Sequence, residues 1–366
     1  MGNSNNSHSE GMNMIKFLFL FSLATNLYFS TSKASNEPRE PSPQELAEAS
    51  AFLNKNNVPL PESWKFERVD LSEHGFIRTG GASPEDPPAT ILFVPGYTSS
   101  QEYVSDLLTR WFESGLEVFS MDLPGQGDSI RRDDDFQKPY TGDWAYYGRA
   151  VTDFVAQLKI NRISKGPLIV IGQSMGGHAV VRSAHEGGLA EVDAIIPLVP
   201  AFYPYTEDEE SLMQIRELAA SAVNNGLGGE YVQGDGPWYP TKFKPESYAE
   251  CGKREDRIFK NEALYRLNKY LRVGGPTYEY IDGLFSSTHE LLDSNALRSL
   301  NVPVFMITAG TEVVVQNNIS YEICAKSIAG CTLTEIADAT HCIHIDAEEV
   351  QLKLQDLILD VIDQVS

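Results

Sequence analysis

The chain has few basic residues for its acidic content. Its 366 residues include 29 Lys and Arg against 51 Asp and Glu, a formal net charge of −22 at pH 7. Surfaces that bind nucleic acid or anionic membranes need an excess of cations, because the phosphate groups they meet are negative. We therefore expect neither nucleic acid nor an anionic membrane surface as a partner.

Potential metal ligands are also sparse. The chain has seven His and four Cys, and only His341, Cys342 and His344 lie close together. No second Cys or His pair stands at a zinc-like spacing, and adjacent residues on an extended chain point to opposite faces. We expect no metal and no cofactor.

Long apolar runs are missing, apart from a short one near the N-terminus. Lys16 precedes the run at 17–24, and the small-residue site Ser32-Lys33-Ala34 follows it. The run is too short to span a membrane, and the order of regions is that of a secretory signal peptide. We predict a signal peptide over residues 1–34, cleaved near Ala34, export to the periplasm or the medium, and no membrane span in the mature chain. An uncleaved N-terminal anchor is the alternative.

An exported chain can keep disulfides. The four cysteines allow three pairings, among which the sequence cannot choose. We expect Cys324–Cys331, which would join a helix end to the following strand. The partners of Cys251 and Cys342 stay open.

The most informative stretch is the segment around Ser174. An apolar run at 167–171 predicts a buried strand, Gly172-Gln173-Ser174-Met175-Gly176 follows, and a helix is predicted from Gly177. Strand, G-x-S-x-G and helix together are typical of a nucleophile elbow, in which glycines prevent a collision between strand and helix. We predict Ser174 as a nucleophile. The backbone N–H of Met175, at the helix start, would face an oxyanion.

The chain around this elbow alternates between the two kinds of element. Apolar strands are predicted at 90–94, 117–121 and 194–199, and helices at 101–113 and 143–161. Such alternation predicts right-handed crossovers and a mostly parallel sheet flanked by helices, in an α/β fold. Ligands bind at the carboxyl ends of the strands in such sheets, where Ser174 would lie.

The alternation stops at Pro200 and resumes at a strand from Val302. Between them, helical stretches and aromatic, Pro-rich loops predict a mainly helical lid over residues 201–300. The predicted organisation is an N-terminal linker at 35–60, followed by a core in two parts, at 61–200 and 301–366.

A serine nucleophile needs a base and an orienting acid. On this kind of sheet the chain order is Ser, acid, His. We assign His341, after the last strand, as base and Glu312, after the preceding strand, as acid. His344 and Asp338 are the respective alternatives.

A second oxyanion donor should come from the loop after the strand at 90–94. Gly96 lets the chain turn tightly there, so the backbone N–H of Tyr97 is the candidate.

These residues carry a family resemblance over about residues 60–365. The chain resembles the α/β-hydrolase fold and, within it, the monoacylglycerol lipase and lysophospholipase L2 group of serine hydrolases. The matching stretches are Pro95-Gly96-Tyr97, Asp122-Leu123-Pro124-Gly125-Gln126-Gly127-Asp128-Ser129, Gly172–Gly177, Gly274-Gly275-Pro276-Thr277, Ala309-Gly310-Thr311-Glu312 and His341. The chain departs from the family at Pro95, where His is usual, and at Glu312, where Asp is usual.

The resemblance implies acyl transfer through an acyl-enzyme on Ser174. The implied substrate is a small lipid or other ester with an apolar acyl chain. One alternative is a peptidase of the same fold that releases N-terminal residues, for which Glu207 to Glu210 could hold the substrate amine. Another is a non-catalytic binding protein that retains the fold.

Overall fold

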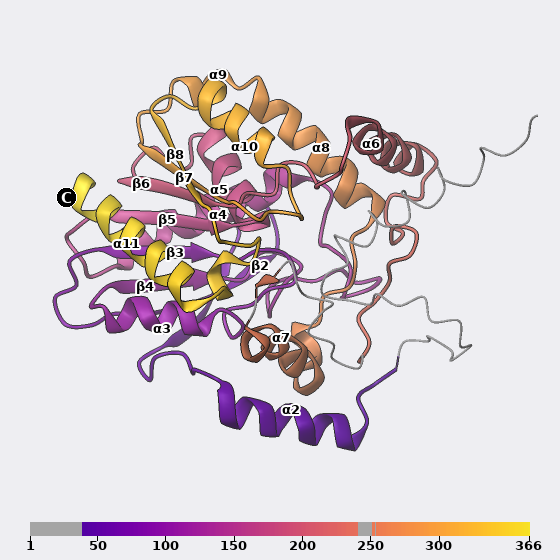
Figure 1. The fold of residues 1–366 in the computed structure, drawn as a ribbon, viewed down its shortest axis with the longest axis horizontal. Helices are drawn as coiled ribbons and strands as arrows, with labels where there is room; N and C mark the ends of the chain where they lie inside the picture. The colour runs from indigo at the N-terminus through magenta and orange to yellow at the C-terminus, as the bar shows by residue number, and fades with distance from the viewer. Residues whose placement is uncertain (1–38, 241–250, 253) are drawn as a thin grey trace, which may run out of the picture.

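The computed structural model describes residues 39–240, 251–252 and 254–366, so the predicted signal peptide lies outside the described residues. In these residues eight strands form one sheet in the order β1-β2-β4-β3-β5-β6-β7-β8 (Figure 1). β2 pairs antiparallel with β1 and β4, and the other neighbours are parallel. The predicted mostly parallel sheet is therefore confirmed. The strands are β1 Lys65–Asp70, β2 Phe76–Ala82, β3 Thr90–Val94, β4 Glu117–Met121, β5 Leu168–Gln173, β6 Ala194–Leu198, β7 Val304–Ala309 and β8 Cys331–Ile336.

The sheet separates two apolar cores. In the central strands β3 and β5, successive side chains point to opposite faces, because a strand alternates with a period of two. Ile91 and Ile169 pack with helices α3 (Ser105–Glu113) and α11 (Glu348–Val365) on one face. Leu92 and Val170 pack with α4 (Trp144–Asn161) and α5 (Met175–His185) on the other. Burial on both faces explains why these strands are continuously apolar.

The remaining helices lie at the N-terminus and after β6. They are α2 Pro43–Asn56, α6 Glu209–Asn224, α7 Glu255–Leu267, α8 Tyr278–Leu292, α9 Asn295–Arg298 and α10 Asn317–Glu322. Short 3₁₀ turns occupy Lys269–Leu271 and Ile343–Ile345, and a π turn Ile323–Ser327. Residues 35–60, predicted as a linker, thus contain α2, which Ser42 begins with a capping box to Glu45.

Some helix boundaries differ from those predicted. The helix predicted at 101–113 begins at Ser105, because residues 101–104 form turns. α7 begins at Glu255, within the stretch that was predicted only as part of a mainly helical lid. Its side chains show almost no amphipathic pattern, so apolar periodicity could not mark its start.

Residues 199–303, here called the inserted segment, carry α6 to α9 between β6 and β7. α7 lies beside α2, far from it in the sequence, with the rings of Phe52 and Phe259 4.7 Å apart (Figure 1). α7 is also fastened to the core, because Lys260 Nζ donates to Ser105 Oγ and Asp106 Oδ1, both at 2.7 Å. The described part of this segment is therefore packed on the core rather than standing away from it.

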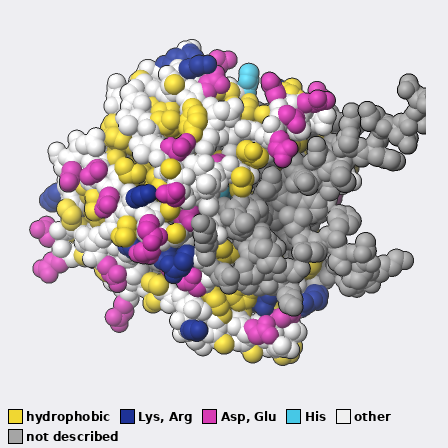
Figure 2. Space-filling model, viewed as in Figure 1, with side chains coloured by type: hydrophobic (Ala, Val, Ile, Leu, Met, Phe, Trp, Pro, Cys, Tyr) yellow, Lys and Arg dark blue, Asp and Glu magenta, His cyan; other side chains and the backbone are white. Residues whose placement is uncertain are grey.

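The surface carries the acidic excess in a dispersed form. On the face shown in Figure 2, Asp and Glu side chains are spread among fewer Lys and Arg. Within the described ranges, no helix is long and apolar enough to cross a membrane.

Candidate active site

Ser174 lies at the sharp turn between β5 and α5. Its backbone has φ 53° and ψ −116°, a conformation that is strained for any residue with a side chain. A Cβ atom on Gly172 would lie 2.3 Å from the Gly176 carbonyl oxygen, and one on Gly176 would lie 2.0 Å from the Val94 oxygen. Only glycine fits at both positions, which is the local reason for the G-x-S-x-G spacing.

Three side chains from distant parts of the chain meet at this turn. His341 Nε2 lies 2.9 Å from Ser174 Oγ, and His341 Nδ1 lies 2.9 Å from Glu312 Oε2. Glu312 Oε1 accepts from the backbone N–H groups of Val314 and Val315, at 2.7 and 3.2 Å. The carboxylate is thus held from two sides, and it can accept only from an Nδ1–H tautomer of His341. That tautomer leaves Nε2 free to take the proton of Ser174.

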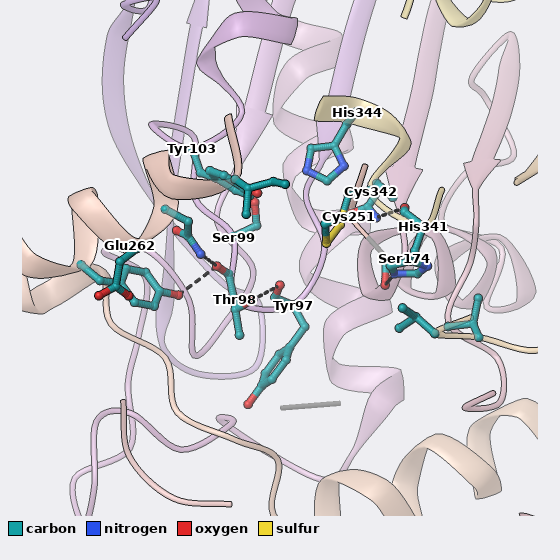
Figure 3. Close-up of a pocket in the computed structure, with 16 residues that line it drawn as sticks. Tyr97, Thr98, Ser99, Tyr103, Ser174, Cys251, Glu262, His341, Cys342 and His344 are labelled. Carbon is teal, nitrogen blue, oxygen red and sulfur yellow. Dashed lines mark hydrogen bonds between the residues drawn. A yellow bond between two sulfur atoms is a disulfide. The ribbon is translucent and has the colours of Figure 1, made fainter. Parts of the chain in front are cut away.

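The alternative base and acid lie elsewhere. Asp338 is exposed and 3.6 Å from Lys353, so its carboxylate faces solvent. His344 is buried near the site with its ring nearly perpendicular to that of Tyr103 (Figure 3), and neither of its ring nitrogens has a hydrogen-bond partner in the described structure. The structure therefore brings His341 and Glu312 to Ser174, and not His344 or Asp338.

The loop with the second predicted oxyanion donor lies against Ser174. A Cβ atom on Gly96 would lie 2.4 Å from Gln173 Oε1 and 3.1 Å from Ser174 Cβ, so a side chain at this position would crowd the elbow. Tyr97 follows Gly96, and its hydroxyl donates to the Gly274 and Gly275 carbonyls, at 3.0 and 3.1 Å. Met175 is the first residue of α5 on the other side of Ser174. Both predicted N–H donors thus belong to residues next to the serine.

A cavity of about 110 Å³ opens beside these groups. Its wall includes Tyr97, Tyr103, Ile258, Tyr265, Val314 and Val315 together with Ser174 and His341. In Figure 3, Ser174 and His341 lie on one side, with Tyr97 and Thr98 opposite. Apolar and aromatic side chains next to a serine suit an apolar group attached to the reacting carbon.

The disulfides join the cysteines in two pairs. Cys324–Cys331 is confirmed, and Cys251 pairs with Cys342, the residue after His341. The second bridge ties the inserted segment to the histidine loop across 91 residues of sequence. No spacing signal in the sequence could have revealed that contact.

The described residues contain no group of three or more His, Cys, Asp or Glu side chains that could hold a metal ion. Two of the three side chains in the His-Cys-His stretch considered from the sequence have other partners. Cys342 is in a disulfide, and both nitrogens of His341 face Ser174 and Glu312.

Sequence reasoning missed several polar contacts around the site. Gln173, inside the elbow, donates from Nε2 to the His341 carbonyl at 3.3 Å. Asn261 and Tyr265 of α7 donate to the Thr98 carbonyl. Gln173 sits at a variable position of the motif, and α7 gives no periodic signal, so neither contact had a sequence marker.

Comparison with known proteins assigns the chain to a family. Residues 85–348 match the family described as "Serine aminopeptidase, S33". The chain belongs to this S33 family. The match includes β3, the elbow, the inserted segment and the histidine loop, and therefore every residue predicted for the site.

Individual relatives of this S33 family chain are distant. Lysophospholipase L2 of Escherichia coli is 24% identical over 285 residues, which cover 75% of this chain and 79% of that protein. A monoglyceride lipase from Saccharomyces cerevisiae has a TM-score of 0.62 at 15% identity, over 85% of this chain and 98% of that one. A carboxyl esterase from Bacillus coagulans has a TM-score of 0.62 at 13% identity, over 83% and 99%. These solved structures show that the fold is that of the α/β-hydrolases.

Proposed function

We propose that this protein is a serine hydrolase that cleaves carboxylic esters of apolar acyl chains, of the lysophospholipase or monoacylglycerol lipase type. The observation that carries the proposal is the continuous pair of 2.9 Å contacts from Glu312 through His341 to Ser174, beside a largely apolar cavity. The names of the relatives, a lysophospholipase and a monoglyceride lipase, point to the same substrate class.

The reaction proceeds in two steps. Ser174 Oγ attacks the ester carbonyl carbon while His341 Nε2 takes its proton, and Glu312 stabilises the imidazolium that forms. The N–H groups of Tyr97 and Met175 donate to the oxyanion. The intermediate collapses, the alcohol leaves with the proton from His341, and the acyl group remains on Ser174. Water, deprotonated by His341, then attacks the acyl carbon, the bond from that carbon to Ser174 Oγ breaks, and His341 returns the proton to Ser174 Oγ as the acid leaves.

An ester substrate suits the cavity better than a peptide amine does. An aminopeptidase needs a carboxylate to hold the substrate ammonium group. Among the residues that line the cavity in the described structure, Glu262 is the one carboxylate, and it already accepts from Arg266 and Trp238. Glu209 and Glu210 lie exposed in the first turn of α6, where carboxylates stabilise a helix, and they are not cavity residues.

The inserted segment serves as the lid in this proposal, since Tyr265 and Ile258 of α7 form part of the cavity wall. Export is part of the proposal as well. Two disulfides are compatible with an oxidising compartment.

The test is ester hydrolysis by the purified mature chain on monoacylglycerol, lysophosphatidylcholine and a short nitrophenyl ester. Ser174→Ala is the control, expected to lose at least about a thousandfold in kcat/KM. Serine-dependent release of long-chain fatty acid supports the lipid substrate, and the kcat/KM values for the two lipids show which head group is preferred. Activity on the short ester alone rejects the lipid substrate, and cleavage of aminoacyl amides in its place favours the peptidase.

A further inference from the structure

The loop that carries the proposed oxyanion donor contains a strained residue. Thr98 follows Tyr97 and has φ 59°, in the left-handed region. A β-branched side chain rarely adopts this conformation, because Cβ and its substituents crowd the backbone. Left to itself, Thr98 would relax to negative φ, so contacts elsewhere in the molecule must hold the loop in this shape.

Two side chains of α7 supply those contacts. Asn261 Nδ2 donates to the Thr98 carbonyl at 3.0 Å, and Tyr265 Oη donates to the same oxygen at 2.8 Å. Dashed lines in Figure 3 mark both bonds at Thr98. The two residues are four apart, which places them on one face of the helix. Tyr265 is buried, and burial raises the pKa of its hydroxyl, so the group stays protonated and can donate.

α7 is itself held in place on the N-terminal side of this contact. Buried Lys260, next to Asn261, is bonded to Ser105 and Asp106 at the start of α3. The Cys251–Cys342 disulfide, four residues before α7, fixes the chain that enters the helix to the histidine loop. α7 therefore presents Asn261 and Tyr265 to the Thr98 carbonyl from a fixed frame.

We propose that Asn261 and Tyr265 are positioning residues for the oxyanion hole, which hold Thr98 in its left-handed conformation and thereby aim the Tyr97 N–H at the reacting carbonyl. The inference rests on the proposed function and adds a role for α7. In this proposal α7, which is not part of the sheet, both covers the cavity and supports the oxyanion hole. Opening of the segment would then switch off the oxyanion donor as well as expose the cavity.

The experiment compares Asn261→Leu, Tyr265→Phe and their double variant with Tyr270→Phe, the same substitution on an exposed tyrosine of the inserted segment. Leu has the same number and branching of side-chain heavy atoms as Asn, and it removes a buried amide oxygen that has no hydrogen-bond partner in the described structure. The measurements are kcat and KM for the ester substrate, affinity for an alkyl boronic acid, and the rate at which a fluorophosphonate labels Ser174. The boronate forms a tetrahedral adduct whose oxygen occupies the oxyanion hole.

A misaimed donor should lower kcat of the double variant about 10- to 100-fold, since loss of a whole donor costs about 10²–10³. Boronate affinity and labelling rate should fall with kcat, KM should stay within about threefold, and Tyr270→Phe should match the wild type. Adding Thr98→Gly to the double variant should restore part of kcat, because glycine adopts positive φ without strain.

Two results would overturn the inference. One is a rise in KM with kcat and boronate affinity unchanged, which makes α7 only a cavity wall. The other is an unaltered rate of Ser174 labelling in the double variant. In both cases the proposed function stands. If the wild-type protein hydrolyses no ester but is labelled at Ser174, the proposed function is rejected, and the labelling rates of the wild type and the double variant still test the inference. If Ser174 of the wild type is not labelled, both the function and the inference are rejected.

Discussion

At the scale of single residues, the sequence gives the order of Ser174, Glu312 and His341 along the chain, but not their distances in space. The sharp turn at Ser174 was predictable because its constraint is local: two glycines flank the serine between a strand and a helix. His341 and His344 are three residues apart in one loop, and only packing decides between them. His341 lies between Glu312 and Ser174, while His344 is buried against Tyr103. The Thr98 geometry could not be predicted, because the donors to its carbonyl come from more than 160 residues away.

Glu312 gives a residue-scale prediction. Glu312→Gln should lower kcat about 10³- to 10⁴-fold, because an amide can present its NH₂ group to His341 and favour the wrong tautomer. Glu312→Asp should retain more activity, since it keeps the charge and loses one methylene group. The measurement is kcat for each variant on a short ester, with folding checked by circular dichroism. Equal activity of the Gln variant and the wild type would remove Glu312 from the proposed mechanism.

At the scale of elements, the strands of the sheet were predictable, and the packing of the inserted segment on the core was not. Strands β3 to β6 are apolar runs in the sequence because helices cover both faces of the sheet. Each strand can therefore be predicted from its own residues. α7 lacks such a signal, since its buried contacts are largely polar and charged, as with Lys260 on Asp106. The Cys324–Cys331 bridge spans seven residues and was expected, whereas Cys251–Cys342 depends on where the inserted segment packs.

The two disulfides should contribute unequally to stability and activity. By chain entropy, closing 91 residues is worth about 4.5 kcal/mol in the free energy of unfolding, and closing 7 residues about 2.5 kcal/mol. The Cys251→Ala/Cys342→Ala variant should therefore unfold at lower urea than Cys324→Ala/Cys331→Ala. It should also lose more activity, because Cys342 adjoins His341. Equal unfolding midpoints with equal kcat would show that the longer bridge plays no special part.

At the scale of the whole molecule, two buried histidines contribute to the response to acid. Burial lowers the pKa of His178 to about 3, and His178 contacts the Ala201 carbonyl and Ser287 Oγ, both at 2.8 Å. Burial, with the nearby His341 and Arg257 charges, lowers the pKa of His344 to about 3 as well. In the unfolded chain a histidine titrates near 6.5. The folded protein must therefore keep both rings neutral at pH values where the unfolded chain protonates them.

This difference predicts where acid destabilises the fold. The stability is fully present above pH 6.5 and is lost as the pH falls from 6.5 toward 3, because the unfolded state then binds more protons. Each histidine should contribute a slope of about 1.4 kcal/mol per pH unit within that window. Urea unfolding at pH 7, 6, 5 and 4 measures it, and His178→Gln should reduce the slope. His289→Gln is the control, because His289 is exposed and its replacement should leave the slope unchanged. A wild-type slope near zero across the window would contradict the assignment.

The central claim is that Ser174 is a nucleophile activated by His341, and the most direct measurement is its reaction with a fluorophosphonate. The folded wild-type chain is treated with the reagent, digested, and the adduct located by mass spectrometry. The account predicts a single adduct on Ser174, and a labelling rate at least about a hundredfold lower in His341→Ala, because the serine then lacks its base. His344→Ala, in the same loop, should react at close to the wild-type rate. An adduct elsewhere, or equal labelling of Ser174 with and without His341, would contradict the account.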